Sequence, residues 1–335
     1  MNCPLRGKTV KENNNFTYFR PIKMGLRERF ASFCKDIHTS WLIRHAKPKR
    51  DEMRKYHVSL CIMFKDEALY LREWLEYHLM VGVDHFYMYD NNSSDGYESV
   101  IKSYLEEGLL TLIPWPKEHS QVEGYEDCIR RFQSESDWIG FIDVDEFLVP
   151  VAEESLVTFL DRFSNRPSVL VYWRFFGSGG MINRDTKRLV TEDFVVASEK
   201  LYTKGKCFFN SNFDYLFGSE KNKSMFHCLW TVSNGKPVPP VDALGHTLYR
   251  SWYLKRKTMT IPIQINHYTL KSYMEHKEKD KKGDVYYDRP THDDRLFFLR
   301  DMRCTVADYH IFKYVTELKL RLEAREKRIN TGPRI

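Results

Sequence analysis

The fold is decided by residues 58–96, which read VSLCIMFKDEALYLREWLEYHLMVGVDHFYMYDNNSSDG. The apolar run His57–Phe64 predicts a short buried strand, and the leucines and tryptophan that follow share one face of a helix. We expect Asp66 to cap that helix and Gly82 to end it. Residues 83–89 predict a second strand, which leads into the turn-forming run DNNSSDG. The stretch therefore predicts a strand, a helix and a second strand.

The same alternation continues as far as residue 142. A helix is expected over 97–107, a strand over 109–113, and then a second helix that a capping box of Ser120 and Glu123 opens. Residues 138–142 predict another buried strand. Strands and helices that alternate in this way indicate a parallel sheet covered by helices. We therefore predict an α/β fold of Rossmann-like type, with a mostly parallel central sheet flanked by helices.

The whole chain divides into three parts. Residues 1–55 predict a basic N-terminal helical extension, residues 56–300 the main domain, and residues 301–335 a basic C-terminal helix. The extension places apolar residues near helical spacing among arginines and lysines. It either packs on the domain as an ordinary helix or docks as an amphipathic helix on anionic lipid. The other elements expected are a helix over 155–163, strands over 168–176 and 261–268, a lysine-rich loop to Gly283, and a helix over 305–328.

The net charge of +6 in 335 residues is unevenly distributed. Residues 1–55 carry 14 lysines and arginines against 5 acidic residues, and residues 313–335 carry 7 against 3. Nucleic-acid-binding proteins usually have a basic domain rather than basic ends on an acidic centre, so we expect no nucleic-acid partner. Seven cysteines without a CxxC pair indicate a reducing compartment, and no apolar run approaches the roughly 20 residues of a spanning helix. We expect a cytoplasmic protein that its basic ends can hold on the inner face of a membrane.

Polar clusters follow three of the predicted strands at their carboxyl ends, where parallel sheets bind ligands. Asp143 and Asp145 come directly after a buried strand, and in an extended segment residues i and i+2 point the same way. Both carboxylates could then face one Mg²⁺ or Mn²⁺ ion, or they could form a solvated acidic turn. Asp90 follows the second strand, where it could accept a hydrogen bond from a nucleoside or belong to a plain loop. Lys65 and Glu67 follow the first strand.

Linked motifs in this chain resemble a known family. Residues 58–96, with DCIRRF at 127–132 and WIGFIDVDEFLVP at 138–150, are similar to the glycosyltransferase family 92 proteins and their relatives in the broader family-2-like group. The likeness extends to RFFGSGG at 174–180 and NHYTLKSYMEHKEKDKKGD at 266–284, and it is looser between these two segments. Several motifs in order, with family-like spacing, are far more specific than a lone DxD triplet.

The resemblance implies a GT-A nucleotide-sugar-binding fold. It also implies transfer of a sugar, often galactose, from a UDP-sugar to a glycan or lipid-linked acceptor, with Mn²⁺ or Mg²⁺ as cofactor. Asp143 and Asp145 would hold the metal with His267 as a third ligand, and Asp143 would be shared with the ribose. The lysine-rich segment would close over the diphosphate as a flexible loop, or be a solvated charged loop. The resemblance also implies that the nucleotide sugar contacts Lys65, Glu67, Asp90, Asn92, Asp95, Lys279 and Lys282.

Inversion of the anomeric centre, which the family implies, needs a carboxylate base. Glu192, Asp185 and Asp193 follow the GSGG turn and are the candidates, with Glu192 preferred. Five aromatic residues could stack on sugars, namely Trp173, Phe175, Phe176, Trp230 and Trp252, although most of the aromatic residues will belong to the core. We therefore expect a metal-dependent glycosyltransferase of cell-surface polysaccharide or glycolipid synthesis. The alternative is a catalytically inactive glycan- or lipid-binding protein of the same fold; nucleotidyl transfer is disfavoured because no glycine-rich phosphate loop follows the first strand.

Overall fold

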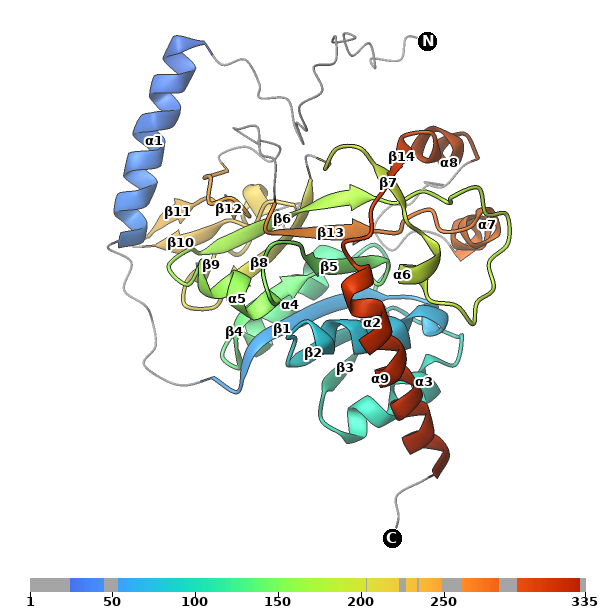
Figure 1. Ribbon diagram of the computed structural model, residues 1–335. Coiled ribbons are helices and arrows are strands. Elements are labelled where there is room, and N and C mark those ends of the chain that lie inside the picture. The colour runs from blue at the N-terminus through green and yellow to red at the C-terminus, as the bar shows by residue number, and fades with distance from the viewer. Residues whose placement is uncertain are drawn as a thin grey trace.

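A sheet of nine strands forms the centre of the molecule. The structure is a computed structural model, and it describes residues 25–44, 54–202, 204–222, 227–233, 235–248, 261–282 and 294–331. Eight strands follow the order β3-β2-β1-β4-β8-β6-β13-β5, and β12 pairs with β6 (Figure 1). They are β1 (Tyr56–Phe64), β2 (His85–Asp90), β3 (Leu110–Pro114), β4 (Ser136–Phe141), β5 (Glu146–Pro150), β6 (Ser168–Phe175), β8 (Gly205–Asn210), β12 (Val241–Asp242) and β13 (Ile263–His267). Two small sheets contain β9 (Asp214–Tyr215), β10 (Thr231–Ser233) and β11 (Lys236–Val238), and β7 (Val196–Ser198) and β14 (Cys304–Ala307).

Helices lie between and around these strands. They are α1 (Leu26–Arg44), α2 (Ala68–Met80), α3 (Tyr97–Glu106), α4 (Gln121–Phe132), α5 (Leu156–Asp161), α6 (Val190–Asp193), α7 (Tyr273–Lys282), α8 (Asp294–Asp301) and α9 (Phe312–Thr331), with a 3-10 turn at Glu220–Asn222. In the part of the chain that the structure describes, no helix is both long enough and apolar enough to cross a bilayer.

Both faces of the central sheet are covered, which explains the unbroken apolar runs in its strands. In β1, Leu60 and Ile62 face the core cluster that includes residues of α2 and α3, whereas Cys61 and Met63 face the cluster that includes residues of α4. Side chains alternate between the two faces of a strand, so the consecutive apolar residues Leu60–Phe64 of β1 fill both clusters. This arrangement confirms the predicted α/β class, with a central sheet flanked by helices.

Most strands of this sheet run in one direction. β1, β2, β3 and β4 pair in parallel, and β6 is parallel to β13. β8 lies between β4 and β6 and is antiparallel to both, so β6 has the direction of β4. β5 is antiparallel to β13. The carboxyl ends of β1, β2, β4, β6 and β13 therefore share one edge of the sheet, which we call the carboxyl edge.

Some local predictions were wrong. Asp66 does not cap α2: its φ is +53°, and its carboxylate accepts from the Ser94 N–H, while Asp95 accepts from the first N–H of α2 at 2.6 Å. Ser120 precedes α4, but it forms no capping box, because its hydroxyl donates to the Lys117 carbonyl. Asp66 and Ser120 thus each form a hydrogen bond with a loop residue instead of with an N–H group of the helix that follows.

The C-terminal region also differs from the prediction. Residues 304–307 form β14 rather than the start of a helix, and α9 begins at Phe312. α9 packs on α2, and its Arg325 is buried where it pairs with Glu76 and Glu107. At least this basic residue therefore fastens α9 to the main domain. The predicted lysine-rich loop is largely helix α7, although Gly283 lies outside the described residues.

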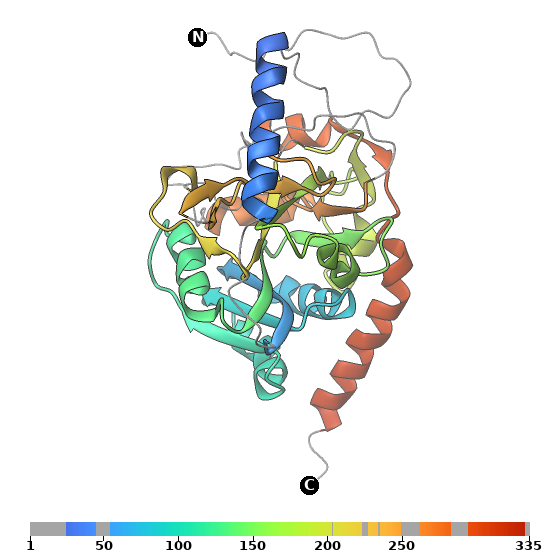
Figure 2. The same ribbon diagram turned by 90° about the vertical axis from the view of Figure 1, so that its left-hand side faces the viewer.

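Helix α1 stands at the side of the domain in Figure 1, and its upper part projects beyond the domain in Figure 2. Its contact with the domain lies near its C-terminal end, where Leu42 is buried with Val238 of β11 and its carbonyl accepts from the Ser233 hydroxyl at 3.4 Å. The N-terminal part of the helix projects beyond this contact.

Candidate active site

The acidic run Asp143–Glu146 leaves the carboxyl end of β4 as a turn. β4 ends at Phe141, and the Glu146 N–H donates to the Asp143 carbonyl at 3.1 Å. The expectation of an extended segment with Asp143 and Asp145 pointing the same way was therefore wrong. Val144 does turn into the core, where it is 5% exposed. The turn brings Asp145 together with Glu146.

Three potential metal ligands meet at this turn. Asp145, Glu146 and His267 each offer an atom, and these atoms lie within 4.8 Å of one another. His267 is the last residue of β13, and it lies opposite Glu146, the first residue of β5, in the antiparallel pair. His267 Nε2 lies 3.5 Å from an Asp145 carboxylate oxygen and 3.9 Å from Glu146 Oε1. Asp145 and His267 therefore lie close together, as predicted. The third member of the group is Glu146 and not Asp143.

Asp143 interacts with neutral and basic side chains instead. Its Oδ1 accepts from Gln121 at 3.0 Å and from the Tyr125 hydroxyl at 3.4 Å, and its Oδ2 accepts from Lys206 at 2.7 Å. Lys206 comes from β8, is 2% exposed, and also lies 3.7 Å from Glu146. Asp143 is not in the group of three ligands found among the described residues. Its half-exposed carboxylate leaves the predicted ribose contact open, and that contact stays a prediction.

Lys279 reaches the same cluster from α7. Its ammonium donates to Asp145 Oδ2 at 2.6 Å. The predicted cationic segment therefore does approach the acidic residues, as a helix rather than as a flexible loop. Lys282 ends α7, and its side chain lies outside the described residues.

Burial and nearby charges together set the ionisation of these groups. Burial alone would raise the pKa of Asp145, but Lys279 and His267 hold it well below its usual range. Burial raises the pKa of Glu146 well above its usual range against the attraction of Lys206, and it lowers the pKa of His267 despite Asp145. The pKa of Lys206 is raised, because Asp143 and Glu146 outweigh its burial. Asp145 is thus the charged carboxylate of the group, beside a neutral histidine.

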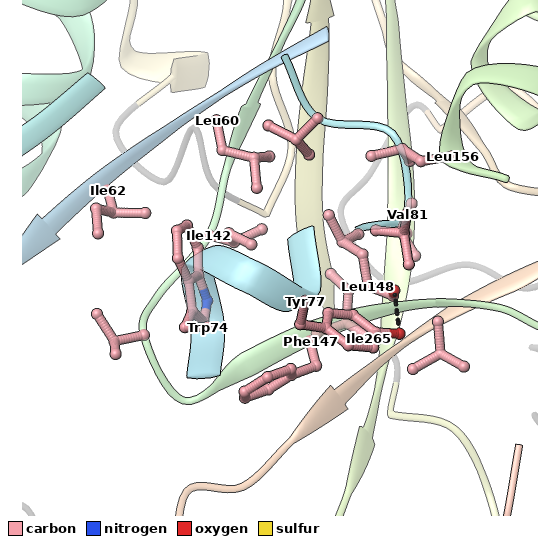
Figure 3. Packing of buried hydrophobic residues seen from close by; sticks show 14 of the residues in the cluster. Leu60, Ile62, Trp74, Tyr77, Val81, Ile142, Phe147, Leu148, Leu156 and Ile265 are labelled. Carbon is pink, nitrogen blue, oxygen red and sulfur yellow. Dashed lines mark hydrogen bonds between the residues drawn. The ribbon is translucent and has the colours of Figure 1, made fainter. Parts of the chain in front are cut away.

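Helix α2 holds the acidic turn in place from the core side. The Trp74 indole N–H donates to the Glu146 carbonyl at 2.9 Å and lies 3.1 Å from the Asp143 carbonyl. Figure 3 shows Trp74 and Tyr77 beside Phe147 and Leu148, with the Tyr77 hydroxyl donating to the Leu148 carbonyl at 2.9 Å. Trp74 therefore fixes both ends of the turn that carries the carboxylates.

The predicted nucleotide contacts lie where β1 and β2 end, in a loop pair joined by hydrogen bonds. Asp90 ends β2, is half-buried, and accepts from the Ser93 N–H at 2.9 Å. Lys65 follows β1 and is half-buried, and Glu67 precedes α2. Asn92 is exposed, with φ at +57°. Asp95 caps α2 and so has a structural role that the sequence did not reveal.

The three predicted base candidates are not joined to the acidic cluster. Glu192 pairs with Lys319 of α9 at 2.8 Å, and Asp193 pairs with Arg188 at 2.6 Å. Asp185 is exposed and accepts from the Lys187 N–H. None of the interactions that the structure gives these three carboxylates involves Asp145 or His267. Their roles stay predictions.

The fold and this site define a class of protein. A Rossmann-like sheet carries three carboxylates, a histidine and two lysines at its carboxyl edge, which is typical of α/β enzymes that bind a phosphorylated ligand there. Comparison with protein families gives the class its name. The model of glycosyltransferase family 92 matches residues 54–294, so the chain belongs to that family. The resemblance drawn from the sequence is confirmed.

Relatives agree with this assignment. A glycosyltransferase family 92 protein of Oryza sativa subsp. japonica is 37% identical over 118 residues, which is 35% of this chain and 20% of the relative. A galactan beta-1,4-galactosyltransferase of Arabidopsis thaliana is 30% identical over 105 residues, 28% of this chain and 21% of the relative. The matched regions thus span about a fifth of these relatives. A solved structure of S. aureus TarS, residues 1–349, matches with a TM-score of 0.31 and 9% identity, over 46% of this chain and 47% of that one.

Proposed function

We propose that the protein is a metal-dependent hexosyltransferase that moves a sugar, with galactose favoured, from a UDP-sugar to a hydroxyl of a glycan or lipid-linked acceptor. The observation that carries the proposal is the meeting of Asp145, Glu146 and His267 at the carboxyl edge, on the same edge as Asp90. The galactose preference rests on the similarity to the galactan beta-1,4-galactosyltransferases of Arabidopsis thaliana. A role in cell-surface polysaccharide or glycolipid synthesis is part of the same proposal.

The donor atoms fit Mn²⁺ or Mg²⁺. Two carboxylates and an imidazole are ligands that Mn²⁺ accepts, and Mg²⁺ prefers the carboxylate oxygens. Glu146 Oε1, which lies 3.9 Å from His267 Nε2, is a buried atom for which the structure gives no hydrogen-bond partner. A cation beside Glu146 would stabilise its ionised form, which burial otherwise disfavours. When bound, the cation would offset the charge that develops on the departing diphosphate.

Lys279 and Lys206 have separate roles in the proposal. Lys279 shares Asp145 with the proposed cation, so the cation would compete with the ammonium for that carboxylate. Once released, the Lys279 ammonium could contact the diphosphate, as the sequence predicts. Lys206 stays buried between Asp143 and Glu146 and keeps the two carboxylates from repelling each other.

The acceptor would lie against aromatic rings beside His267. The Phe175 ring stacks on His267 with centroids 5.1 Å apart, and the Tyr202 ring packs edge-on against Phe175 at 5.0 Å. Tyr202 is 42% exposed. Aromatic faces bind the apolar faces of sugars, so this pair of rings could place an acceptor sugar next to the proposed cation.

Thermal unfolding with and without UDP tests the metal and the donor nucleotide. UDP should raise the midpoint of the native chain only when Mn²⁺ or Mg²⁺ is present, and Asp145→Asn and Glu146→Gln should each abolish that rise. Asp161→Asn, which removes an exposed carboxylate from α5, should keep it. A rise without metal, or a rise that survives in Asp145→Asn, would contradict metal dependence.

Slow hydrolysis of a panel of UDP-sugars then tests the reaction. We expect the native chain to release UDP fastest from UDP-galactose and Asp145→Asn to release none above background. Faster release of UDP from another UDP-hexose would change the sugar that we assign to the donor, but the reaction would still be a sugar transfer. Metal-dependent UDP binding without turnover of any donor would favour the inactive binding protein.

A further inference from the structure

Helix α1 presents a stripe of large apolar side chains to solvent. Leu26, Phe30, Phe33 and Ile37 are 88%, 69%, 60% and 55% exposed, and Trp41 is 52% exposed. At 100° per residue these positions lie within about 80° of one another around the helix axis. Soluble domains rarely expose apolar residues in such a continuous row, so the stripe needs a partner.

The domain is not that partner, because it contacts the opposite face of the helix. Thr39 and Leu42 are buried, with 4% and 2% exposure. On the helical wheel they lie roughly 140–160° from the middle of the stripe. Leu42 packs with Val238, and its carbonyl accepts from Ser233. The stripe therefore faces away from the domain, in agreement with the projecting position of α1 in Figures 1 and 2.

The charges around the stripe suit an anionic surface. Arg27 and Arg29 lie roughly 80° to either side of its middle, and Glu28 lies on the opposite side of the helix. Residues 1–55 as a whole carry 14 lysines and arginines against 5 acidic residues. A second copy of the chain, packed stripe to stripe with the two helices parallel, would bring the arginines of both copies together, which like charges disfavour. Anionic lipid headgroups, in contrast, attract such residues.

We propose that α1 is an interfacial membrane helix, which lies in the headgroup region of an anionic bilayer with Leu26, Phe30, Phe33 and Ile37 inserted and Arg27 and Arg29 at the headgroups. Amphipathic helices with aromatic residues on one face and basic residues beside it bind membranes in this way. The inference goes beyond the proposed function, since it concerns where the enzyme acts and not what it transfers. Of the two alternatives for the extension, the proposal takes the docking helix, whose opposite face packs on the domain.

Flotation of the full chain with vesicles tests the inference. The native chain should float with phosphatidylcholine vesicles that contain phosphatidylglycerol, and much less with phosphatidylcholine alone. The double variant Phe30→Ser, Phe33→Ser should lose at least about tenfold in binding, because each inserted ring contributes through burial of its apolar area. The double variant Arg27→Gln, Arg29→Gln should lose the preference for anionic vesicles.

A matched control is Phe298→Ser with Met302→Ser, which removes two exposed apolar side chains, 54% and 68% exposed, at the end of α8. It should bind vesicles like the native chain. A cooperative thermal unfolding transition with a midpoint close to that of the native chain shows that the domain of each variant is folded. The inference is overturned if the native chain does not float, if the Phe30, Phe33 variant floats like the native chain, or if the stripe proves to be a dimer seam. In the last case the native chain would be a dimer in light scattering without vesicles and the Phe30, Phe33 variant a monomer.

Discussion

Replacement of Trp74 by phenylalanine should weaken both the stability of the protein and its site. The substitution removes the indole N–H that donates to the Glu146 carbonyl at 2.9 Å and lies 3.1 Å from the Asp143 carbonyl. Trp74 is fully buried, so water does not replace the lost donor. A buried acceptor left unsatisfied costs ~1–3 kcal/mol, and the void beside the smaller ring adds about 1 kcal/mol. We expect the free energy of unfolding to fall by about 2–4 kcal/mol.

Urea unfolding of Trp74→Phe and of Trp138→Phe measures this effect. Trp138 is 2% exposed and belongs to the same core cluster, but its indole donates to neither carbonyl of the acidic turn. The control should therefore lose only about 1 kcal/mol, the cost of the void. Trp74→Phe should also raise the Mn²⁺ concentration needed for the UDP-dependent thermal shift, because the turn that carries Asp145 and Glu146 is no longer held. Equal stability losses in the two variants, with an unchanged Mn²⁺ requirement, would refute the role given to Trp74.

Two further predictions concern the acceptor and the dependence of stability on pH. Tyr202→Ala should raise the KM for a glycan acceptor several-fold while leaving donor hydrolysis unchanged. The control is Tyr309→Ala, which removes another exposed tyrosine, 56% exposed. An equal rise in KM in the control would contradict the proposed acceptor site at Tyr202. Burial lowers the pKa of His78 to about 3, so between about pH 6.5 and pH 3 the unfolded chain binds a proton that the folded chain does not, and stability must fall as the pH falls through that window. His78→Gln should flatten this slope in urea titrations from about pH 7 to about pH 4, and an unchanged slope would show that His78 does not contribute to it.

The strands of the parallel half could be predicted to within two residues, because two buried faces leave an unbroken apolar run. β1 was expected over 57–64 and spans Tyr56–Phe64. Helix α7 was missed because its sequence is mostly charged. Its position depends on tertiary contacts that no local pattern contains: Glu275 of α7 pairs with Arg184 at 2.9 Å and accepts from the Tyr70 hydroxyl at 3.0 Å.

The candidate site was predicted in part. His267 and Asp145 were expected together, and they lie 3.5 Å apart. Glu146 was missed because the DxD triplet was interpreted as extended, and only a turn brings its carboxylate beside Asp145. Lys206 was missed because it comes from β8, an antiparallel strand inserted between β4 and β6, and nothing in the sequence indicates that insertion. Cytoplasmic location and inversion stay predictions.

The site depends on strand register as much as on the acidic turn. His267 reaches Glu146 because β13 pairs with β5 so that these two residues lie opposite each other. Shifting β13 by one residue would turn every side chain of that strand to the other face of the sheet, and the imidazole would leave the cluster. The register suits both buried faces of β13: Ile263 and Ile265 pack in the core cluster that includes residues of α2 and α3, whereas Gln264 and Asn266 hydrogen-bond to each other on the other face. The packing of two isoleucines thus positions the histidine, and the alternation of apolar and polar residues that ends at His267 carries this information in the sequence.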